Sequence, residues 1–323
     1  MCTAISYCGK KHYFGRNLDL EYTYDETITI TPRSYPFSFS NGEMISNHHA
    51  MIGMATVVNH YPLYYEATNE AGLSIAALNF PGNAFYGSYI PGMINLCPFE
   101  FIPYMLTHYS RVKELKTELN HFNIVDVPFN KEYNNTPLHW IISDNHESIT
   151  VEPLKDGMII YDNPVGVLTN NPPFDYHMYN LTNYMNLTSE EPTNRFSSSI
   201  NLTPYSRGMG GIGLPGDLSS SSRFVRAAFN KLNSAKQETE DADISQFFHI
   251  LGSVAQQSGC VKVDNKLEKT IYTSCCDTQS GIYYYKTYEN SQITAVNMFH
   301  ENLNSNQLIS FSLIKTQLIR YEN

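Results

Sequence analysis

The sequence predicts an α+β protein in which β-sheets are stacked in layers and covered by a small number of helices. Strand-like segments fill much of the first half of the chain and recur towards its C-terminal end, whereas few segments have helical apolar spacing. Such elements bury their apolar faces by packing in layers. With 323 residues, of which 42% are hydrophobic, the chain is long enough to bury a large core.

The first predicted element is a β-hairpin. Residues 2–7 and 12–19 are strand candidates, and the Gly-Lys-Lys segment at 9–11 suits a turn between them. Folding the second strand back beside the first places Arg16 and Asp19 near the N-terminus. There Asp19 can hold the α-ammonium group of the N-terminus, and the positive charge of Arg16 can favour the thiolate form of Cys2. The alternative is a surface ion pair, which is the commoner arrangement for such residues.

The later elements follow in the order strands, helices, strands. Short apolar or alternating runs predict strands over residues 27–31, 51–58, 73–77, 139–143, 148–152, 158–161, 166–169, 269–273, 282–288, 293–296 and 308–313. Apolar residues at helical spacing predict helices over 98–122, 222–232 and 243–254, the last with a cap at Asp243. Residues 184–216 are rich in Asn, Ser, Thr, Pro and Gly, which predicts a long loop.

This loop contains Gly208-Met-Gly-Gly-Ile-Gly213, which satisfies the Gly-x-Gly-x-x-Gly pattern of dinucleotide sites. In such sites the motif follows a buried strand and opens a helix. Here it follows Pro-Tyr-Ser-Arg and leads into Leu-Pro-Gly-Asp, which breaks helices. The sequence therefore predicts no nucleotide site at this position.

The pair Met1-Cys2 predicts a catalytic N-terminus. A cysteine in second place becomes the first residue once the initiator methionine is removed, and the thiol is small enough for that removal. One residue then carries both a nucleophile, the thiol, and a base, the α-amino group, an arrangement used in catalysis. On this pair alone, a cysteine of no function beside the start of translation is the simpler interpretation.

Composition and charge narrow the other possibilities. The net charge of −10 comes without a basic stripe, which disfavours nucleic-acid binding. The histidines are scattered, and neither His-Glu-x-x-His nor Cys-x-x-Cys occurs, so we expect no metal site. Residues 1–20 lack the apolar core of a secretory signal, and the longest apolar stretch, 50–58, is too short to span a bilayer. We therefore expect a cytoplasmic protein with reduced cysteines, no membrane contact and no nucleic-acid partner.

The opening blocks Met1-Cys-Thr-Ala4 and Phe14-Gly-Arg-Asn-Leu-Asp19 resemble the choloylglycine hydrolases. That family comprises bile salt hydrolases and penicillin V acylases, and it belongs to the N-terminal nucleophile hydrolases. Further matching blocks follow in order: Asn69-Glu-Ala-Gly-Leu-Ser74, Leu78-Asn-Phe-Pro-Gly82, Leu138-His-Trp-Ile-Ile-Ser-Asp144, Leu168-Thr-Asn-Asn-Pro172, Ser222-Arg-Phe-Val-Arg226, Tyr272-Thr-Ser-Cys275 and Gly281-Ile-Tyr-Tyr-Tyr-Lys-Thr-Tyr-Glu289. The resemblance covers nearly the whole chain.

The resemblance implies a four-layer αββα sandwich of the N-terminal nucleophile hydrolase type, with Cys2 at the end of a central strand. It implies a single domain over residues 1–323, no cofactor, and a bacterial homotetramer. The predicted loop at about 184–217 resembles the extended loop that reaches a neighbouring subunit in tetrameric bile salt hydrolases.

The matched blocks also imply six catalytic residues: Cys2, Arg16, Asp19, Asn79, Asn170 and Arg223. In this interpretation the Cys2 thiolate attacks an amide carbonyl, and a thioester forms that water then hydrolyses. Asn79 and Asn170 hold the oxyanion, and Arg223 supports Asp19 or the thiolate. The alternatives are that the asparagines cap turns and that Arg223 is a solvated arginine at the start of a helix.

The resemblance implies that the substrate is a glycine- or taurine-conjugated bile salt. At the position of Asn79 this sequence is similar to bile salt hydrolases, whereas penicillin V acylases commonly have tyrosine there. Loop alignment to the family suggests an apolar cleft lined by Leu18, Val58, Tyr65, Phe129 and Tyr133. Arg207, in a Ser-Arg-Gly loop, is a candidate for holding the carboxylate of glycine conjugates. Penicillin V and N-acyl homoserine lactones remain alternative substrates. The non-enzyme alternative is a catalytically silent relative that binds bile acids or lipids in the same cleft.

Overall fold

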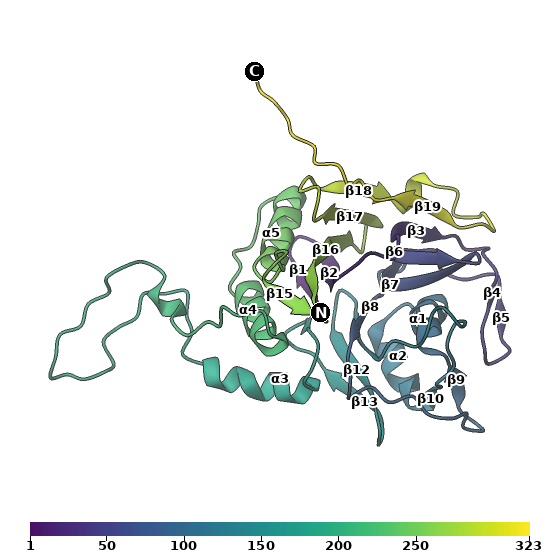
Figure 1. Ribbon diagram of the computed structural model, residues 1–323, viewed down its shortest axis with the longest axis horizontal. Coiled ribbons are helices and arrows are strands. Elements are labelled where there is room, and N and C mark those ends of the chain that lie inside the picture. Colours follow the sequence, from purple (N-terminus) through teal and green to yellow (C-terminus); the bar gives the residue numbers. More distant parts are fainter.

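The computed structural model describes residues 1–323, and it contains two β-sheets that lie face to face between two layers of helices (Figure 1). The first sheet has the strand order β14-β1-β2-β16-β17-β18, with β15 paired to β16. Its strands are Val167–Leu168, Cys2–Cys8, His12–Leu20, Lys266–Asp277, Ile282–Thr287 and Thr294–Asn297 in that order, and β15 spans Val261–Val263.

The second sheet has the order β13-β12-β11-β8-β7-β6-β3-β19. Its strands are Gly157–Asp162, Ser148–Leu154, Leu138–Ser143, Ser74–Asn79, Tyr61–Asn69, Met51–Val58, Thr27–Thr31 and Ile309–Ser312. Two small pairs lie outside the sheets, β4 (Phe37–Ser38) with β5 (Met44–Ile45) and β9 (Ile94–Leu96) with β10 (Phe122–Ile124). Both large sheets are antiparallel throughout.

Helices complete the two outer layers. On the first sheet lie α4 (Ser220–Leu232) and α5 (Glu240–Gly252), with α3 (Phe174–Asn180) beside α4; on the second lie α1 (Phe101–His108) and α2 (Val112–Glu118) (Figure 1). Short 3-10 helices span Pro98–Glu100, Leu119–His121, Leu181–Tyr184, Met209–Gly211 and Met298–His300. One buried cluster joins the facing sides of both sheets to α4 and α5, and a second buries α1 and α2 against the second sheet. This is the αββα sandwich that the resemblance implies.

The hairpin is confirmed: β1 and β2 pair in antiparallel register, with Cys2 opposite Leu18 and Ala4 opposite Arg16. The predicted strands at 27–31 and 51–58 coincide with β3 and β6, and the other predicted strands overlap observed ones. The sequence analysis missed β7, because Pro62 and the inward-facing Glu66 interrupt the apolar pattern that identifies a strand. It also missed α3, which has only seven residues.

The single helix predicted over 98–122 is wrong, because the chain turns between α1 and α2. Tyr109 is extended, with φ −122° and ψ 148°, and its carbonyl accepts a hydrogen bond from Asn69 Nδ2 at 2.8 Å. The Glu114 carboxylate then accepts from the backbone nitrogens of Ser110 and Arg111, at 2.9 and 3.2 Å, and caps the new helix. Apolar spacing alone does not reveal these side-chain contacts.

The predicted start of α5 at Asp243 is also wrong. The helix begins one turn earlier, where the Thr239 hydroxyl caps it by accepting from the backbone nitrogen of Ala242 at 3.2 Å. Asp243 lies inside the helix, is buried, and accepts from the backbone nitrogen of Lys10 in the hairpin turn at 2.6 Å. Its role is to fasten the hairpin to the helix layer.

Between Tyr184 and Ser220 the chain contains only the short helix Met209–Gly211, and it projects from the body of the molecule (Figure 1). The glycine motif at 208–213 lies in this loop and follows no strand, which agrees with the prediction that it binds no nucleotide. No helix combines the length and the apolar character needed to cross a bilayer. No cluster of three or more His, Cys, Asp or Glu side chains is arranged to hold a metal ion.

Candidate active site

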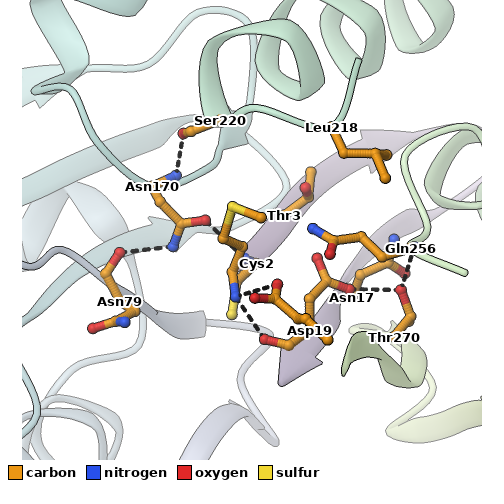
Figure 2. Close-up of polar contacts among 12 residues, drawn as sticks. Cys2, Thr3, Asn17, Asp19, Asn79, Asn170, Leu218, Ser220, Gln256 and Thr270 are labelled. Carbon is orange, nitrogen blue, oxygen red and sulfur yellow. Dashed lines mark hydrogen bonds and ion pairs between the residues drawn. The ribbon is translucent and has the colours of Figure 1, made fainter. Parts of the chain in front are cut away.

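Cys2 lies at the first position of β1, the strand between the edge strand β14 and β2 in the first sheet. Only 3% of its surface is exposed, and its sulfur is a free thiol. Its backbone nitrogen donates a hydrogen bond to Asn170 Oδ1 at 2.7 Å (Figure 2). This nitrogen carries Met1 in the structure, and removal of Met1 converts it into an α-amino group.

Asn170 follows β14 and connects the parts of the site. Its Oδ1 accepts from Arg223 Nη2 at 2.8 Å as well as from Cys2, and its Nδ2 donates to the carbonyl oxygen of Asn79 at 2.7 Å. Its backbone nitrogen donates to Ser220 Oγ at 2.8 Å (Figure 2). Two donors on one side of the amide and a carbonyl on the other determine its orientation, since only Oδ1 can accept and only Nδ2 can donate.

Two buried histidines hold the backbone at Thr169 and Asn170 in place by hydrogen bonds. His177 Nε2 donates to the Asn170 carbonyl at 2.9 Å, and His139 Nε2 donates to the Thr169 carbonyl at 2.9 Å. Because a carbonyl can only accept, each of these Nε2 atoms carries a proton. Burial lowers the pKa of His177 to about 4, although its hydrogen bond to Asn170 acts in the opposite direction, so the ring is neutral near pH 7.

Arg223 is completely buried on α4 and reaches across to β1. Its Nη1 donates to the carbonyl oxygen of Cys2 and, at 2.7 Å, to Thr3 Oγ1, while Nε donates to the Leu218 carbonyl at 3.0 Å. Burial lowers the pKa of Arg223, and the negative charges of Asp19 and Cys2 oppose that effect. The alternative of a solvated arginine at a helix start is therefore wrong.

Asp19 is also fully buried, on β2. Its Oδ1 accepts from the Thr270 hydroxyl at 2.6 Å, whereas Oδ2 has no hydrogen-bond partner within the protein. Burial raises the pKa of the Asp19 carboxyl, and the positive charge of Arg223 is the largest effect opposing that rise. Its backbone carbonyl accepts from the Met1 ammonium at 2.6 Å, which places the N-terminus beside this residue.

Arg16 lies on β2 with 1% of its surface exposed. Its Nη1 donates to the carbonyl oxygens of Tyr65, at 3.1 Å, and of Ala77, and its Nε is 3.9 Å from Glu66 Oε2. Burial alone would lower the pKa of Arg16, but the negative charges near it, that of the Cys2 thiolate first, raise it above its usual value. Arg16 and Asp19 are thus not the surface ion pair that was the alternative.

Asn79 ends β8 on the second sheet and faces the first across Asn170 (Figure 2). Its backbone carbonyl is occupied by Asn170 Nδ2, and its side-chain Oδ1 is buried without a partner. Its Nδ2 makes no hydrogen bond within the protein, so this amide is free to donate to a bound group. The site thus contains a thiol, a backbone nitrogen that can become an amine, two arginines, a carboxylate and a free amide donor.

The sequence model of the choloylglycine hydrolase family, described as linear amide C–N hydrolases, matches residues 2–311. The chain belongs to this family. It is therefore an amidohydrolase that acts on linear amides, and the family interpretation of the sequence is confirmed. The match includes every one of the six residues that the motifs selected.

Characterised members of the choloylglycine hydrolase family resemble the whole chain. A bile salt hydrolase/transferase of Lactiplantibacillus plantarum is 54% identical over 314 residues, covering 97% of each protein. The crystal structure of a variant conjugated bile acid hydrolase from Clostridium perfringens superposes with a TM-score of 0.93 at 38% identity, covering 100% of both chains. A penicillin V acylase from Agrobacterium tumefaciens has a TM-score of 0.75 at 21% identity, covering 96% of this chain and 91% of its own, which supports the shared fold.

The candidate substrate residues of this choloylglycine hydrolase lie in three places. Leu18 pairs with Cys2 across the hairpin, and Tyr65 supplies a carbonyl to Arg16. The other aromatic candidates and Val58 lie on or near the second sheet: Val58 ends β6, and Phe129 packs at 6.4 Å between ring centres against Tyr133 in the connection between β10 and β11. Arg207 is exposed in the projecting loop, and its guanidinium makes no hydrogen bond or ion pair within the chain.

A polar cavity of about 540 Å³ lies at the other end of β1, around Ser6, Cys8 and Lys231. Cys2 and Cys8 are at opposite ends of the seven-residue strand β1, so this cavity is not part of the candidate site around Cys2. The polar network around Asn170 meets the buried Cys2 at the opposite end of β1 from this cavity.

Sequence analysis missed the residues that support the six. They include residues outside the family blocks quoted above, which contact the candidate site residues or the groups beside them: Glu66, His177, Ser220, Gln256, Glu268 and Thr270. Glu268 Oε1 binds the Met1 ammonium at 2.7 Å. Their local sequences carry no recognisable signal, because each one acts through a contact with a distant segment.

Proposed function

We propose that this enzyme hydrolyses the amide bond of glycine- or taurine-conjugated bile salts, with Cys2 as the nucleophile after removal of Met1. The observation that carries the proposal is the hydrogen bond from the Cys2 nitrogen to Asn170 Oδ1 at 2.7 Å, because it holds the future α-amine in a fixed position beside its own thiol. The substrate class is supported by the relatives at 54% and 38% identity, which are named for bile salts and conjugated bile acids.

In the proposed first step, the α-amine of Cys2 takes the proton of the thiol, directly or through one water. The thiolate sulfur then attacks the amide carbon and forms a tetrahedral intermediate. The buried guanidinium groups of Arg16 and Arg223 stabilise the negative sulfur, since charges interact strongly away from bulk water. Asp19 offers its free Oδ2 to the ammonium group that forms.

The oxyanion of that intermediate requires hydrogen-bond donors. Asn79 Nδ2 is free within the protein, so Asn79 is the donor that needs no rearrangement. Asn170 uses its Nδ2 on the Asn79 carbonyl and its backbone nitrogen on Ser220, so in this arrangement it holds Asn79 and the Cys2 nitrogen in place. Both residues are part of the proposed catalytic group.

Collapse of the intermediate breaks the carbon–nitrogen bond and leaves the bile acid as a thioester on Cys2. The leaving glycine or taurine takes the proton that the α-amine holds. The same amine, now neutral, then removes a proton from water, whose oxygen attacks the thioester. The second collapse releases the carboxylic acid and returns the proton to the sulfur, so the cycle needs no cofactor.

We propose that the substrate cleft is lined by Leu18, Val58, Tyr65, Phe129 and Tyr133. A steroid skeleton presents a broad apolar surface, and aromatic side chains supply large apolar contact areas for such a ligand. Replacing Phe129 by Ala should raise KM for glycocholate and change kcat little, because the ring would contact the steroid and not the amide.

We further propose a single domain over residues 1–323 that assembles as a homotetramer in the bacterial cytoplasm. The projecting loop at about 184–217 exposes large apolar side chains, including Phe196 at 82% and Tyr205 at 85% exposure. Exposed apolar groups of this kind are typical of protein interfaces. Light scattering on the wild type and on Phe196→Asp would test the assembly, since the substitution should yield a smaller species.

A turnover panel tests the proposed function and its alternatives together. The protein is incubated separately with glycocholate, taurocholate, penicillin V and an N-acyl homoserine lactone, and the released amine is quantified. The proposal predicts fastest release from a bile salt and none from the Cys2→Ala variant. Faster cleavage of penicillin V or of the lactone would mean that this compound, and not a bile salt, represents the preferred substrate. Binding of glycocholate without cleavage, by protein that begins at Cys2, would indicate a catalytically silent relative.

A further inference from the structure

Thr270 lies directly across from Asp19 in the first sheet. The residues pair where β16 runs beside β2, and the register shifts immediately afterwards, between Thr270 and Tyr272. Such a bulge re-aims a side chain and is frequent beside active sites. Thr270 is 6% exposed, and its hydroxyl lies 2.6 Å from Asp19 Oδ1 (Figure 2).

The direction of this hydrogen bond is determined by a second contact. The backbone nitrogen of Gln256 donates to Thr270 Oγ1 at 2.8 Å, and the backbone nitrogen of Thr270 donates back to the Gln256 carbonyl at 3.0 Å (Figure 2). The Thr270 oxygen is therefore an acceptor for Gln256, and its single proton is left for Asp19. An ionised carboxylate can only accept, so this arrangement suits Asp19 in its charged form.

No other side chain donates a hydrogen bond to Asp19. Burial raises the pKa of this carboxyl, and the hydrogen bond from Thr270 is among the effects that oppose the rise. The ionisable groups that face Asp19 from β1, β2, α4 and β16 are the N-terminal ammonium, the Cys2 thiol, Arg16, Arg223 and Glu268. They act through charge, whereas Thr270 alone fixes one oxygen and leaves Oδ2 without a partner.

We infer that Thr270 is a positioning residue for the hydrolysis: its hydroxyl keeps the Asp19 carboxylate ionised and oriented, with Oδ2 free for the α-ammonium of Cys2. This inference rests on the proposed function. It gives the threonine hydroxyl a role that the family motifs do not assign, and it explains why an otherwise unsupported carboxylate is held in a buried site beside the nucleophile.

The test compares Thr270→Val with Thr273→Val. Thr273 lies on the same strand, is also buried, and donates to Asn17 Oδ1 at 2.8 Å, so its replacement also removes a buried hydroxyl contact but not one to a carboxylate. For each protein, kcat and KM for glycocholate are measured from pH 4 to 8. Hydrogen bonds to charged groups are among the stronger ones, so losing one should move a carboxyl titration by roughly one pH unit.

Thr270→Val should lower kcat about tenfold near pH 5 and leave KM within about twofold. The acidic limb of the kcat profile should move to higher pH by roughly one unit. Thr270→Ser should restore the wild-type profile, and Thr273→Val should leave the limb where it is. If Thr270→Val does not fold, Thr270→Ala removes the same hydroxyl without placing a methyl group against the carboxylate.

An unchanged acidic limb in the folded Thr270 variant that lacks the hydroxyl would overturn the inference, as would an equal shift in Thr273→Val. These results differ from a failure of the proposed function. That failure would appear as a wild-type protein that begins at Cys2 and releases no glycine at any pH.

Discussion

The Asn170 side-chain oxygen accepts a hydrogen bond from the Cys2 nitrogen across 168 residues of sequence. The same oxygen binds Arg223, and the amide nitrogen beside it binds the carbonyl of Asn79. One carboxamide thus connects β1, α4 and the second sheet at the point where the layers meet. A small displacement of this amide would disturb the proposed nucleophile Cys2, an arginine and the proposed oxyanion donor together.

Replacing Asn79 by Ala should reduce kcat for glycocholate by about 10²–10³-fold, because loss of one oxyanion donor has an effect of that size. KM should change little, since the donor acts on charge that develops only in the transition state. Steady-state kinetics on Asn79→Ala and on Asn79→Asp check this. A kcat within threefold of the wild type in Asn79→Ala would remove Asn79 from the oxyanion site.

The free energy of unfolding should decrease as the pH is lowered, over a pH range set by the titration of His177. Burial lowers the pKa of this ring to about 4, against about 6.5 in the unfolded chain, so the unfolded state binds more protons between these values. The stabilisation is complete above pH 6.5 and is lost as the pH falls to 4, with a limit of about 3 kcal/mol.

Urea unfolding at pH 7 and at pH 4.5 measures this effect. His177→Phe keeps a ring stacked on Phe224, where the ring centres are 4.6 Å apart, and removes the titrating group. It should be less stable than the wild type at pH 7, because the Asn170 carbonyl loses its donor, and its stability should depend less on pH. Replacement of the exposed His121 by Phe is the control; a pH dependence of His177→Phe equal to that of this control would contradict the prediction.

Cys2 should react with iodoacetamide before the other cysteines in protein that begins at Cys2. Cys97, Cys275 and Cys276 are buried, and burial raises the pKa of each. Burial also raises the pKa of Cys8, against the nearby charge of Lys231. Peptide mapping after brief alkylation, with Cys2→Ala as the control, measures the order, and prior reaction of Cys8 or Cys260 would count against an activated Cys2.

The preference between conjugates should depend on Arg207. A guanidinium binds a planar carboxylate through two parallel hydrogen bonds, and a tetrahedral, weakly basic sulfonate gains less from that geometry. We therefore expect a higher kcat/KM for glycocholate than for taurocholate, and a smaller ratio in Arg207→Ala. Arg207 is exposed in the loop that projects from the body of the molecule, so in the proposed tetramer it would act on the site of a neighbouring subunit. An identical ratio in Arg207→Ala would exclude this role.

The layers of the fold and the candidate site residues were predictable from the sequence to different degrees. The strand β3 alternates threonine with isoleucine and β6 is mostly apolar, and the predicted bounds of both strands agree with the structure. The family blocks named Asn170 and Arg223, but pattern alone would have left them as a turn residue and a helix-start arginine. Burial of Arg223 depends on the packing of α4 against β1, which no local pattern contains.

The contacts that support the candidate site residues could not be predicted either, because they also depend on packing between segments that are distant in sequence. Thr270 and Asp19 are 251 residues apart and meet only because β16 pairs with β2. The break between α1 and α2 at Tyr109 depends on a hydrogen bond from Asn69, at the end of β7. The strand β7 was missed because its buried Glu66 is tolerated only through hydrogen bonds from the hydroxyls of Tyr272 and Tyr283 in the opposite sheet. Side chains that satisfy buried polar groups thus decide where simple periodicity fails.

The proposed chemistry requires that a free Cys2, and not Met1, begins the active chain. The decisive measurement combines intact mass with release of glycine from glycocholate on the same sample, for the wild type and for Cys2→Ser. We expect a wild-type mass lacking methionine, rapid release of glycine, and nearly complete loss of turnover in a folded Cys2→Ser protein. Full activity in a preparation whose mass shows Met1 retained, or normal turnover by the serine variant, would contradict this expectation.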